Sequence, residues 1–252
     1  MAKQMSRLHL GCGVTTPSGW VNVDGSWNAR LARYAVVRRV LRALRVLPRE
    51  KFDVPWSSDI LIHDVRKPLP FPNSLFDGIY ASHLLEHLNL EEGKRLLREC
   101  FRVLQPNGVL RMVVPDLEAI VREYLGEKPF GELSGEMEML PPADRLNRRL
   151  LLRSPEPSSG GIVLRTYTTL KDLHSHKWMY DANSLVIHFQ QTGFAEVREM
   201  RFHESRIPGI QDIEQASRVL NGEGICIEGV KREVLLGPSV RREAAIFPEK
   251  TP

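Results

Sequence analysis

The chain has 252 residues, of which 42% are hydrophobic, and a formal net charge of +4. The N-terminus has no apolar signal-peptide core and no stretch reaches the ~18 apolar residues of a membrane span, so we expect a cytoplasmic protein. Seven arginines and no acid lie within 26–49, which leaves the rest of the chain net negative and gives no indication of a nucleic-acid partner.

The chain length and the cysteines fit one intracellular α/β domain. The length suits a single domain with additions, which we place at residues 1–236, followed by a flexible C-terminal tail at 237–252. Cys12, Cys100 and Cys226 lack metal-type spacing. They do not indicate a disulfide framework, which agrees with a reducing compartment.

The first predicted strand, Leu8-His9-Leu10, runs directly into the turn Gly11-Cys12-Gly13. Two glycines let the backbone approach a bound molecule closely. In an open α/β sheet, ligands bind at the carboxyl ends of the strands. We therefore expect a ligand near this turn, although many strands end at glycines for structural reasons alone.

Four further predicted strands follow, and an acid closes three of them. The four strands cover 21–24, 59–64, 76–83 and 108–116. Asp24 closes the first of these strands and Asp64 closes the second. A carboxylate can accept hydrogen bonds from both hydroxyls of a ribose. The glycine turn and these two aspartates are therefore expected to line one crevice suited to an adenosine.

In these motifs the sequence resembles the class I S-adenosylmethionine-dependent methyltransferases. The resemblance is dense over residues 6–125 and looser to about residue 232. It implies a Rossmann-like α/β fold with a mostly parallel seven-stranded sheet, an antiparallel closing hairpin and helices on both faces. The matching parts are the Gly11-Cys12-Gly13 turn, Asp24, Asp64, and the runs 69–77, 85–88 and 102–108.

The resemblance also implies S-adenosyl-L-methionine as the cofactor, with Asp64 near the adenine amino group. The implied cofactor-binding residues are Leu10, Gly11, Cys12, Gly13, Asp24, Asp64, Val65 and His83. Thr15 stands where the family has a third glycine. The interval from Gly11 to Asp24 is also short against the usual spacing of about 20 residues. Both departures indicate a shortened first crossover.

Residues 27–50 read as a basic helical insert, with apolar side chains on one face and arginines on the other. In one interpretation, the apolar face packs on the sheet in place of the shortened first helix. In the other, residues 27–49 contact membrane phosphates, an anionic glycan or a partner subunit. Association into a homodimer is a further expectation.

The second half of the chain continues the α/β pattern around a long insert. Residues 126–165 are expected to form a lid over the acceptor or a disordered insert, with a short basic helical piece at 144–153. The other predicted elements are an amphipathic helix at 90–104, a helix at 182–192 ended by Gly193, and strands at 194–202 and 224–230.

A polar cluster follows the fourth strand. If a helix begins at His83, then His83, Glu86 and His87 share one face, the spacing at which a helix offers three ligands to a metal. The run is similar to the Glu-x-x-Glu-His arrangement of metal-dependent O-methyltransferases, with His83 replacing the first glutamate. This exchange favours Mn²⁺ over Mg²⁺. A metal-free histidine base and a purely structural histidine pair remain open.

A second polar cluster begins at His174. In an extended stretch, His174 and His176 point the same way and could complete a metal shell or contact the acceptor. Trp178 and Tyr180 suit stacking on a sugar or a base, or packing on the sheet. We predict Glu86, His87 and His174 as metal ligands, and His83, Glu86 and His176 as catalytic residues.

The sequence thus predicts an S-adenosylmethionine-dependent O-methyltransferase. The expected acceptor is a hydroxyl of a sugar, a glycan or another polyhydroxylated metabolite, with Mg²⁺ or Mn²⁺ as a second cofactor. Two alternatives stay open. One is an RNA 2′-O-methyltransferase, and the other is an adaptor subunit that binds the cofactor without catalysis.

Overall fold

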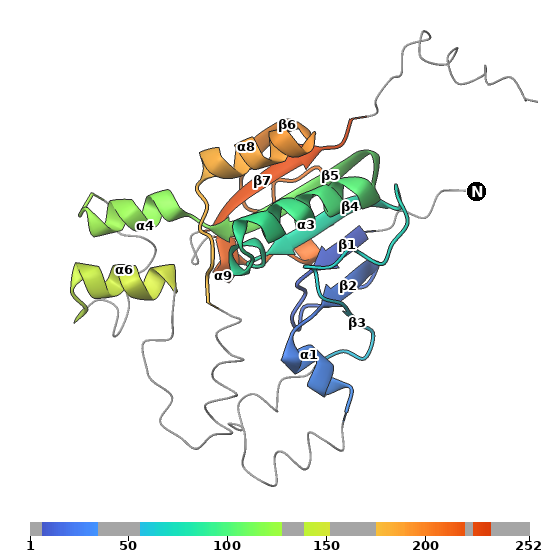
Figure 1. The fold of residues 1–252 in the computed structure, drawn as a ribbon, viewed down its shortest axis with the longest axis horizontal. Helices are drawn as coiled ribbons and strands as arrows, with labels where there is room; N and C mark the ends of the chain where they lie inside the picture. The colour runs from blue at the N-terminus through green and yellow to red at the C-terminus, as the bar shows by residue number, and fades with distance from the viewer. Residues whose placement is uncertain (1–6, 35–55, 128–138, 152–174, 220–223, 233–252) are drawn as a thin grey trace, which may run out of the picture.

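The structure is a computed structural model that describes residues 7–34, 56–127, 139–151, 175–219 and 224–232. Its strands form a single sheet in the order β3-β2-β1-β4-β5-β7-β6 (Figure 1). The first five in this order run parallel, and β7 is antiparallel to both β5 and β6. The strands are β1 Arg7–Leu10, β2 Trp20–Asp24, β3 Leu61–Ile62, β4 Phe76–Ser82, β5 Leu104–Pro115, β6 Ala195–Met200 and β7 Gly224–Val230. The predicted seven-stranded sheet with its closing hairpin is confirmed.

The helices begin and end at recognisable capping residues. They are α1 Trp27–Ala32, η2 Leu85–His87, α3 Leu90–Val103, α4 Leu117–Tyr124, α6 Pro142–Leu150, α8 Ala182–Thr192, η4 Ile210–Asp212 and α9 Ala216–Val219. Asn89 opens α3 with a capping box, and Asp181 does the same for α8. Gly193 ends α8 in the left-handed region, as the sequence predicted.

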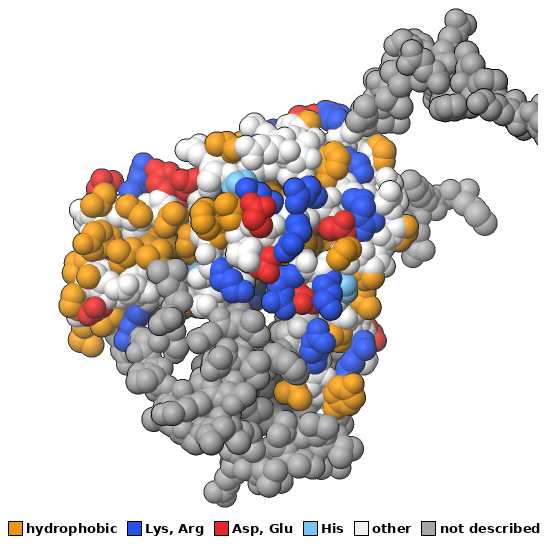
Figure 2. Space-filling model, in the orientation of Figure 1, with side chains coloured by type: hydrophobic (Ala, Val, Ile, Leu, Met, Phe, Trp, Pro, Cys, Tyr) orange, Lys and Arg blue, Asp and Glu red, His pale blue; other side chains and the backbone are white. Residues whose placement is uncertain are grey.

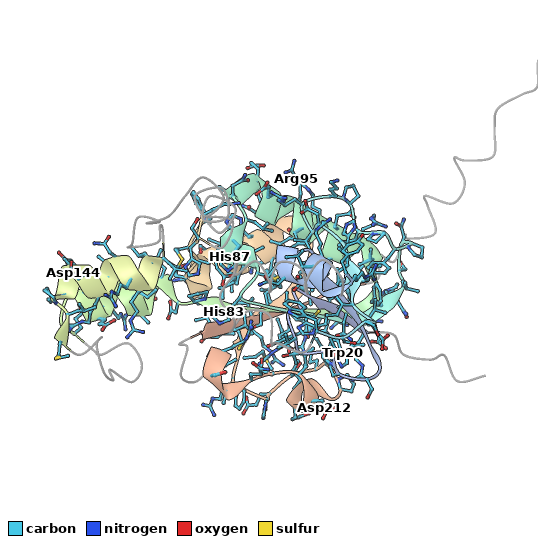
Figure 3. All side chains as sticks on the ribbon, turned by 90° about the horizontal axis from the view of Figure 1, so that it is seen from below. Trp20, His83, His87, Arg95, Asp144 and Asp212 are labelled. Atoms are coloured by element: carbon cyan, nitrogen blue, oxygen red, sulfur yellow. The ribbon has the colours of Figure 1, made fainter. Side chains whose placement is uncertain are left out.

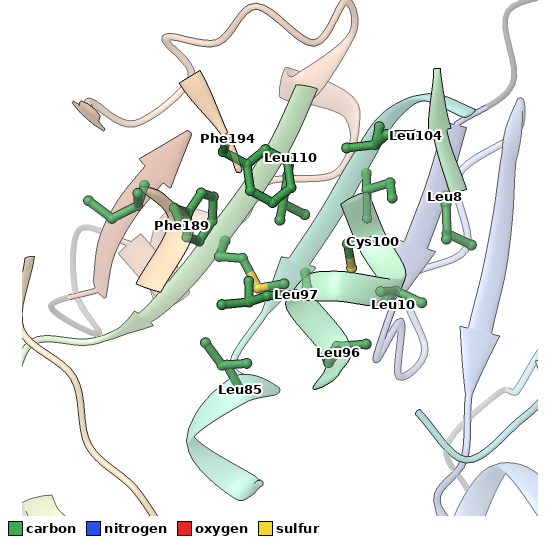
Figure 4. Packing of buried hydrophobic residues seen from close by; sticks show 14 of the residues in the cluster. Leu8, Leu10, Leu85, Leu96, Leu97, Cys100, Leu104, Leu110, Phe189 and Phe194 are labelled. Carbon is green, nitrogen blue, oxygen red and sulfur yellow. The ribbon is translucent and has the colours of Figure 1, made fainter. Parts of the chain in front are cut away.

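One face of the sheet is covered by α3 and α8 (Figure 1). Leu97 and Cys100 of α3 and Phe189 of α8 are fully buried against Leu110 of β5 (Figure 4). The pattern Leu96, Leu97, Cys100 and Val103 repeats at helical spacing, so α3 presents one apolar stripe to the sheet. Its opposite face carries charged side chains. Burial of these apolar side chains anchors the strands whose ends form the site described below.

The other face is covered by the segment between β6 and β7. Ile207, Ile210 and Ile213 of this segment pack against Trp20 and Tyr80 of the sheet. The connection from β1 to β2, residues 11–19, contains no helix. The shortened first crossover is therefore confirmed, and η4 and α9 lie on the face that a first helix would cover.

Parts of the predicted inserts lie outside the described residues. Only α1 of the basic insert 27–50 is described, so the helical pattern beyond Tyr34 is not covered. Within 126–165 the structure describes α6, which begins at Pro142 rather than at Asp144 and packs against α4. Residues 128–138 and 152–165 of that insert and the 237–252 tail lie outside the described part of the chain.

The expected strand at 59–64 is wrong in length. Only Leu61 and Ile62 pair with β2, because Asp59 stands in a turn before them and the chain leaves the sheet at His63. The three cysteines are buried and carry free thiols. Within the described ranges, no helix has the length and apolar character needed to cross a bilayer.

Candidate active site

A cavity of about 570 Å³ opens at the carboxyl ends of the parallel strands. It is lined by residues that follow β1, β2, β3 and β4, next to the point between β1 and β4 where the strand order reverses. Ligands of open α/β sheets bind at this kind of position, and the volume suits a small molecule. Of the predicted cofactor residues, those that line the cavity are Gly11, Gly13, Asp24, Asp64, Val65 and His83.

The turn after β1 is shaped for close approach of a ligand. Gly11 has φ +66° and Gly13 has φ +55°, a region that favours glycine. A Cβ atom at Gly13 would meet no atom within 4 Å, so the turn faces open space. Leu10 and Cys12, which were also predicted as cofactor residues, point into the protein interior and do not line the cavity.

Asp24 ties the glycine turn to the start of α1. Its Oδ2 accepts a hydrogen bond from the Gly13 amide at 2.9 Å, and its Oδ1 accepts one from the Ser26 amide at 2.7 Å. The side chain is buried but lines the cavity. Because a carboxylate has about four acceptor positions, both oxygens can still accept from ribose hydroxyls.

Asp64 stands on the cavity wall after β3 and forms a bidentate ion pair. Its two oxygens accept from Nε and Nη2 of Arg66 at 2.9 and 2.8 Å. This pairing lowers the pKa of Asp64 to about 2, so the carboxylate stays ionised at neutral pH. Oδ1 also accepts from the Arg66 amide at 3.1 Å, so Oδ2 is the oxygen with acceptor capacity left for an adenine amino group. Arg66 is thus a cavity residue that the sequence analysis did not identify.

No helix begins at His83, so the predicted helical spacing there is wrong. His83 has φ +50° because its amide donates to the Val113 carbonyl at the end of β5, and the helical turn η2 starts at Leu85. A left-handed conformation is uncommon outside glycine and often marks a functional site. The hydrogen bond from the His83 amide joins the end of β4 to the end of β5. No local sequence pattern predicts such a long-range bond.

The His83 ring faces two acceptors. Its Nε2 lies 3.0 Å from the Arg218 carbonyl oxygen, and its Nδ1 lies 3.2 Å from Glu86 Oε1 in an ionic contact. Burial lowers the pKa of His83, but the neighbouring Glu86 carboxylate outweighs it, and the pKa is raised above its usual value. An imidazolium satisfies both acceptors, so this geometry does not favour His83 as a general base.

Glu86, His87 and His176 form a cluster that could hold a metal ion. One ligand atom from each lies within 4.8 Å of the others. Glu86 is fully buried, and apart from the ionic contact of Oε1 with His83 its carboxylate oxygens have no partner among the described residues. The Nδ1 atom of His176 is likewise buried and has no hydrogen-bond partner. Buried polar atoms of this kind call for a partner.

The segment after the second insert is held against η2. The amide of Lys177 donates to the Glu86 carbonyl oxygen at 2.7 Å, which places His176 beside Glu86. His174, the predicted third ligand, lies outside the described residues. His87 lines the cavity and so connects the cluster to it, and Figure 3 shows His83 and His87 near one another.

Several cavity residues carried no signal in the sequence. Arg218 belongs to α9, between β6 and β7. It lines the cavity because the fold brings α9 there, and its position in the sequence does not indicate this. Ser26, the N-cap of α1, was not predicted as a cavity residue. Its position depends on the hydrogen bond from its amide to Asp24 Oδ1. Other cavity residues that were not predicted are Asn28, Arg30, Trp56 and Lys177.

Comparisons with known proteins identify part of the chain directly. Residues 8–112 match the family model described as a methyltransferase domain. No curated protein sequence matches the chain. The matched residues contain β1, β2 and β4 with the glycine turn and both cavity aspartates.

The chain is similar in outline to several solved structures. YcgJ from Bacillus subtilis has 15% identity and a TM-score of 0.45, with 91% of this chain and 92% of that chain covered. A Thermotoga maritima S-adenosylmethionine-dependent methyltransferase, described as a possible histamine N-methyltransferase, has 16% identity, a TM-score of 0.45 and coverages of 90% and 81%. An Archaeoglobus fulgidus S-adenosylmethionine-dependent methyltransferase has 14% identity and a TM-score of 0.45, with 90% of this chain and 86% of that chain covered.

Residues 8–112 share the pattern of a methyltransferase domain, and they supply most of the cavity lining. The mostly parallel sheet, reversed by β7 and β6, is the Rossmann-like arrangement expected from the sequence. The match over residues 8–112 and the cavity support methyl transfer with S-adenosylmethionine as the methyl donor. The residues present fit the cofactor, because the turn at Gly13 leaves room for it and Asp24 offers acceptors at its side.

Proposed function

We propose that this enzyme transfers the methyl group to a hydroxyl of a sugar, a glycan or another polyhydroxylated metabolite, with help from a divalent metal ion. The cluster of Glu86, His87 and His176 beside the cofactor cavity is the observation that carries this proposal. Its buried carboxylate has one oxygen in ionic contact with His83, and the Nδ1 of His176 has no hydrogen-bond partner, so both residues can offer ligand atoms. Two imidazoles and one carboxylate suit Mn²⁺ or another transition ion better than Mg²⁺.

The cluster supports activation of a hydroxyl. Three protein ligands leave coordination positions open, as in catalytic metal sites. A bound divalent ion lowers the pKa of a coordinated hydroxyl. S-adenosylmethionine, when bound, would supply the methyl group: the acceptor oxygen would bond to the methyl carbon as the carbon–sulfur bond breaks with its electron pair going to sulfur, and the hydroxyl proton would pass to solvent water. His87 would orient the acceptor toward the cavity, because His87 belongs both to the ligand cluster and to the cavity lining.

Trp178 supports a sugar as the acceptor. Trp178 is 43% exposed, and its amide lies 3.3 Å from the Glu86 carbonyl oxygen, so its backbone is held beside Glu86. An indole offers an apolar plate with a polar edge, which suits stacking on a sugar ring. Tyr180, by contrast, is 2% exposed and belongs to the core, so it is not available for stacking.

RNA as the acceptor has less support. Lys and Arg side chains gather over α3 in Figure 2, but acids lie among them. Glu91 pairs with Lys94, and Glu99 pairs with Arg102. Paired charges of this kind give a mixed surface and not the continuous basic stripe that binds phosphates.

Metal binding is tested by titrating Mn²⁺ into the chelator-treated enzyme by calorimetry. We expect one Mn²⁺ to bind, and His176→Ala to weaken this binding by about 10-fold or more. His188→Ala is the matched control, because His188 is a half-buried histidine on α8 outside the cluster. Equal Mn²⁺ affinity in His176→Ala and wild type would contradict the metal site.

Turnover on a panel of glycans, polyhydroxylated metabolites and RNA tests the acceptor. The proposal predicts methylation of a glycan or metabolite hydroxyl that stops with chelator and returns with Mn²⁺. Turnover that persists with chelator would instead favour a metal-free base. Methylation of RNA alone would overturn the acceptor class. Cofactor binding without turnover on any substrate of the panel would favour the adaptor alternative.

A further inference from the structure

Arg218 lies on the opposite side of the glycine turn from the cavity aspartates. In the sheet, β3 and β2 stand on one side of β1, and their ends carry Asp64 and Asp24. On the other side stands β4, which ends at Ser82. The Arg218 Nη1 donates to the Ser82 carbonyl oxygen at 3.2 Å, and the side chain lines the cavity.

The Arg218 guanidinium is suited to receive an anion. Within the described ranges, no carboxylate forms an ion pair with it, whereas Arg66 on the same cavity wall is paired with Asp64. A guanidinium has five N–H donors, and the bond to Ser82 uses one of them. The remaining fork matches the geometry of a carboxylate.

The segment that carries Arg218 is anchored to the glycine turn. Gln215 Nε2 donates to Thr15 Oγ1 at 2.8 Å, and the Arg218 carbonyl accepts from His83. Residues 11–19 form no helix, so the turn lacks the helix N-terminus that receives anions in many βαβ units. Arg218 supplies a positive charge at the place where that N-terminus is missing.

We propose that Arg218 binds the α-carboxylate of the methionine part of S-adenosylmethionine. Asp24 and Asp64 fix the adenosine on the β2 and β3 side, so the amino-acid part extends past the glycine turn toward β4. The carboxylate is the anionic group of the cofactor, and Arg218 is the guanidinium at that end of the cavity. The assignment depends on the cofactor alone and not on the proposed acceptor or metal.

Three adenosine ligands, of which only the first carries a carboxylate, test the assignment. They are S-adenosylhomocysteine, decarboxylated S-adenosylmethionine and 5′-methylthioadenosine, which has no amino-acid part. By calorimetry we expect Arg218→Ala to weaken S-adenosylhomocysteine binding by about 10- to 100-fold, since a hydrogen bond between charged groups is lost. Binding of the two ligands without a carboxylate should change by less than about 2-fold. Arg218→Lys should retain part of the affinity because it keeps the charge.

Two control variants sharpen the test. Arg95→Ala removes an exposed arginine of α3 remote from the cavity lining (Figure 3) and should leave all three affinities unchanged. Lys177 is another cation of the cavity wall. A carboxylate-specific loss in Lys177→Ala and not in Arg218→Ala would overturn the assignment. So would an Arg218→Ala variant that loses all three ligands equally, or one that binds S-adenosylhomocysteine as the wild type does.

Discussion

His9 is an ionisable residue in the interior of the sheet. It lies in β1 with its ring centroid 6.4 Å from that of Trp20 and 5.5 Å from that of Tyr80, and it is 4% exposed. Burial lowers the pKa of His9 from 6.5 to about 4. In the unfolded chain the same histidine titrates near its ordinary value. Between these two values, the unfolded state therefore binds a proton that the folded state does not.

This difference makes stability depend on pH in a known direction. Stability rises with pH where the unfolded state binds more protons, so acidification below the ordinary histidine pKa must destabilise the fold. We expect His9 to lower the free energy of unfolding by about 2 kcal/mol between about pH 7 and about pH 5. Urea denaturation of wild type and His9→Phe at both pH values measures it. The same pH dependence in both proteins would contradict this role of His9.

At the scale of elements, one arginine joins the irregular segment after β6 to the sheet. Arg111 of β5 is fully buried and donates to both carboxylate oxygens of Glu214 at 2.8 and 2.9 Å. Its Nη1 donates to Glu228 of β7 at 3.1 Å. Further bonds go to the carbonyls of Arg201 and Glu204. This network holds the segment that carries η4 and α9.

Removal of the arginine should destabilise this segment strongly. Arg111→Met leaves the buried carboxylates of Glu214 and Glu228 without a cation, and we expect a loss of about 3–5 kcal/mol in the free energy of unfolding. Arg122→Met on α4 is the control, because Arg122 is 57% exposed in its pair with Glu118 and should change stability by less than about 1 kcal/mol. Similar losses in the two variants would contradict the account.

The elements that were predicted correctly have local signals. Asp181 and Gly193 bound α8 by their capping chemistry, and the predicted strand at 224–230 coincides with β7. The turn at His83 was predicted wrongly, because its conformation depends on a bond to Val113 in another strand. The segment 201–219 has only single helical turns, so it shows no periodicity from which its place on the sheet could be predicted.

The residues of the candidate site also fall into those with a local sequence signal and those without one. Gly13, Asp24 and Asp64 follow strands directly, so their common edge could be predicted from the order of elements. The Arg218 carbonyl oxygen contacts the His83 ring although the two residues are 135 positions apart in the sequence, and no motif predicts this contact. His176 joins Glu86 through a backbone bond of the next residue, which also has no sequence signal.

For the whole molecule, the two faces of the sheet have different tasks. The helices α3 and α8 cover one face with apolar contacts, and the segment between β6 and β7 covers the other and brings Arg218 to the cavity. The cavity thus depends on residues that are far apart in the sequence, since its lining includes both Gly11 and Arg218. The central claim is that S-adenosylmethionine binds in this cavity, against Asp24.

Calorimetric titration of S-adenosylmethionine into wild type, Asp24→Ala and Asp59→Ala tests this claim most directly. Asp59 is an exposed acid in the turn before β3 and serves as the control. The account predicts one bound cofactor in wild type and Asp59→Ala, and an affinity at least about 10-fold weaker in Asp24→Ala, because the acceptors for the ribose are lost. A wild type that does not bind, or an Asp24→Ala variant that binds as tightly as wild type, would contradict it.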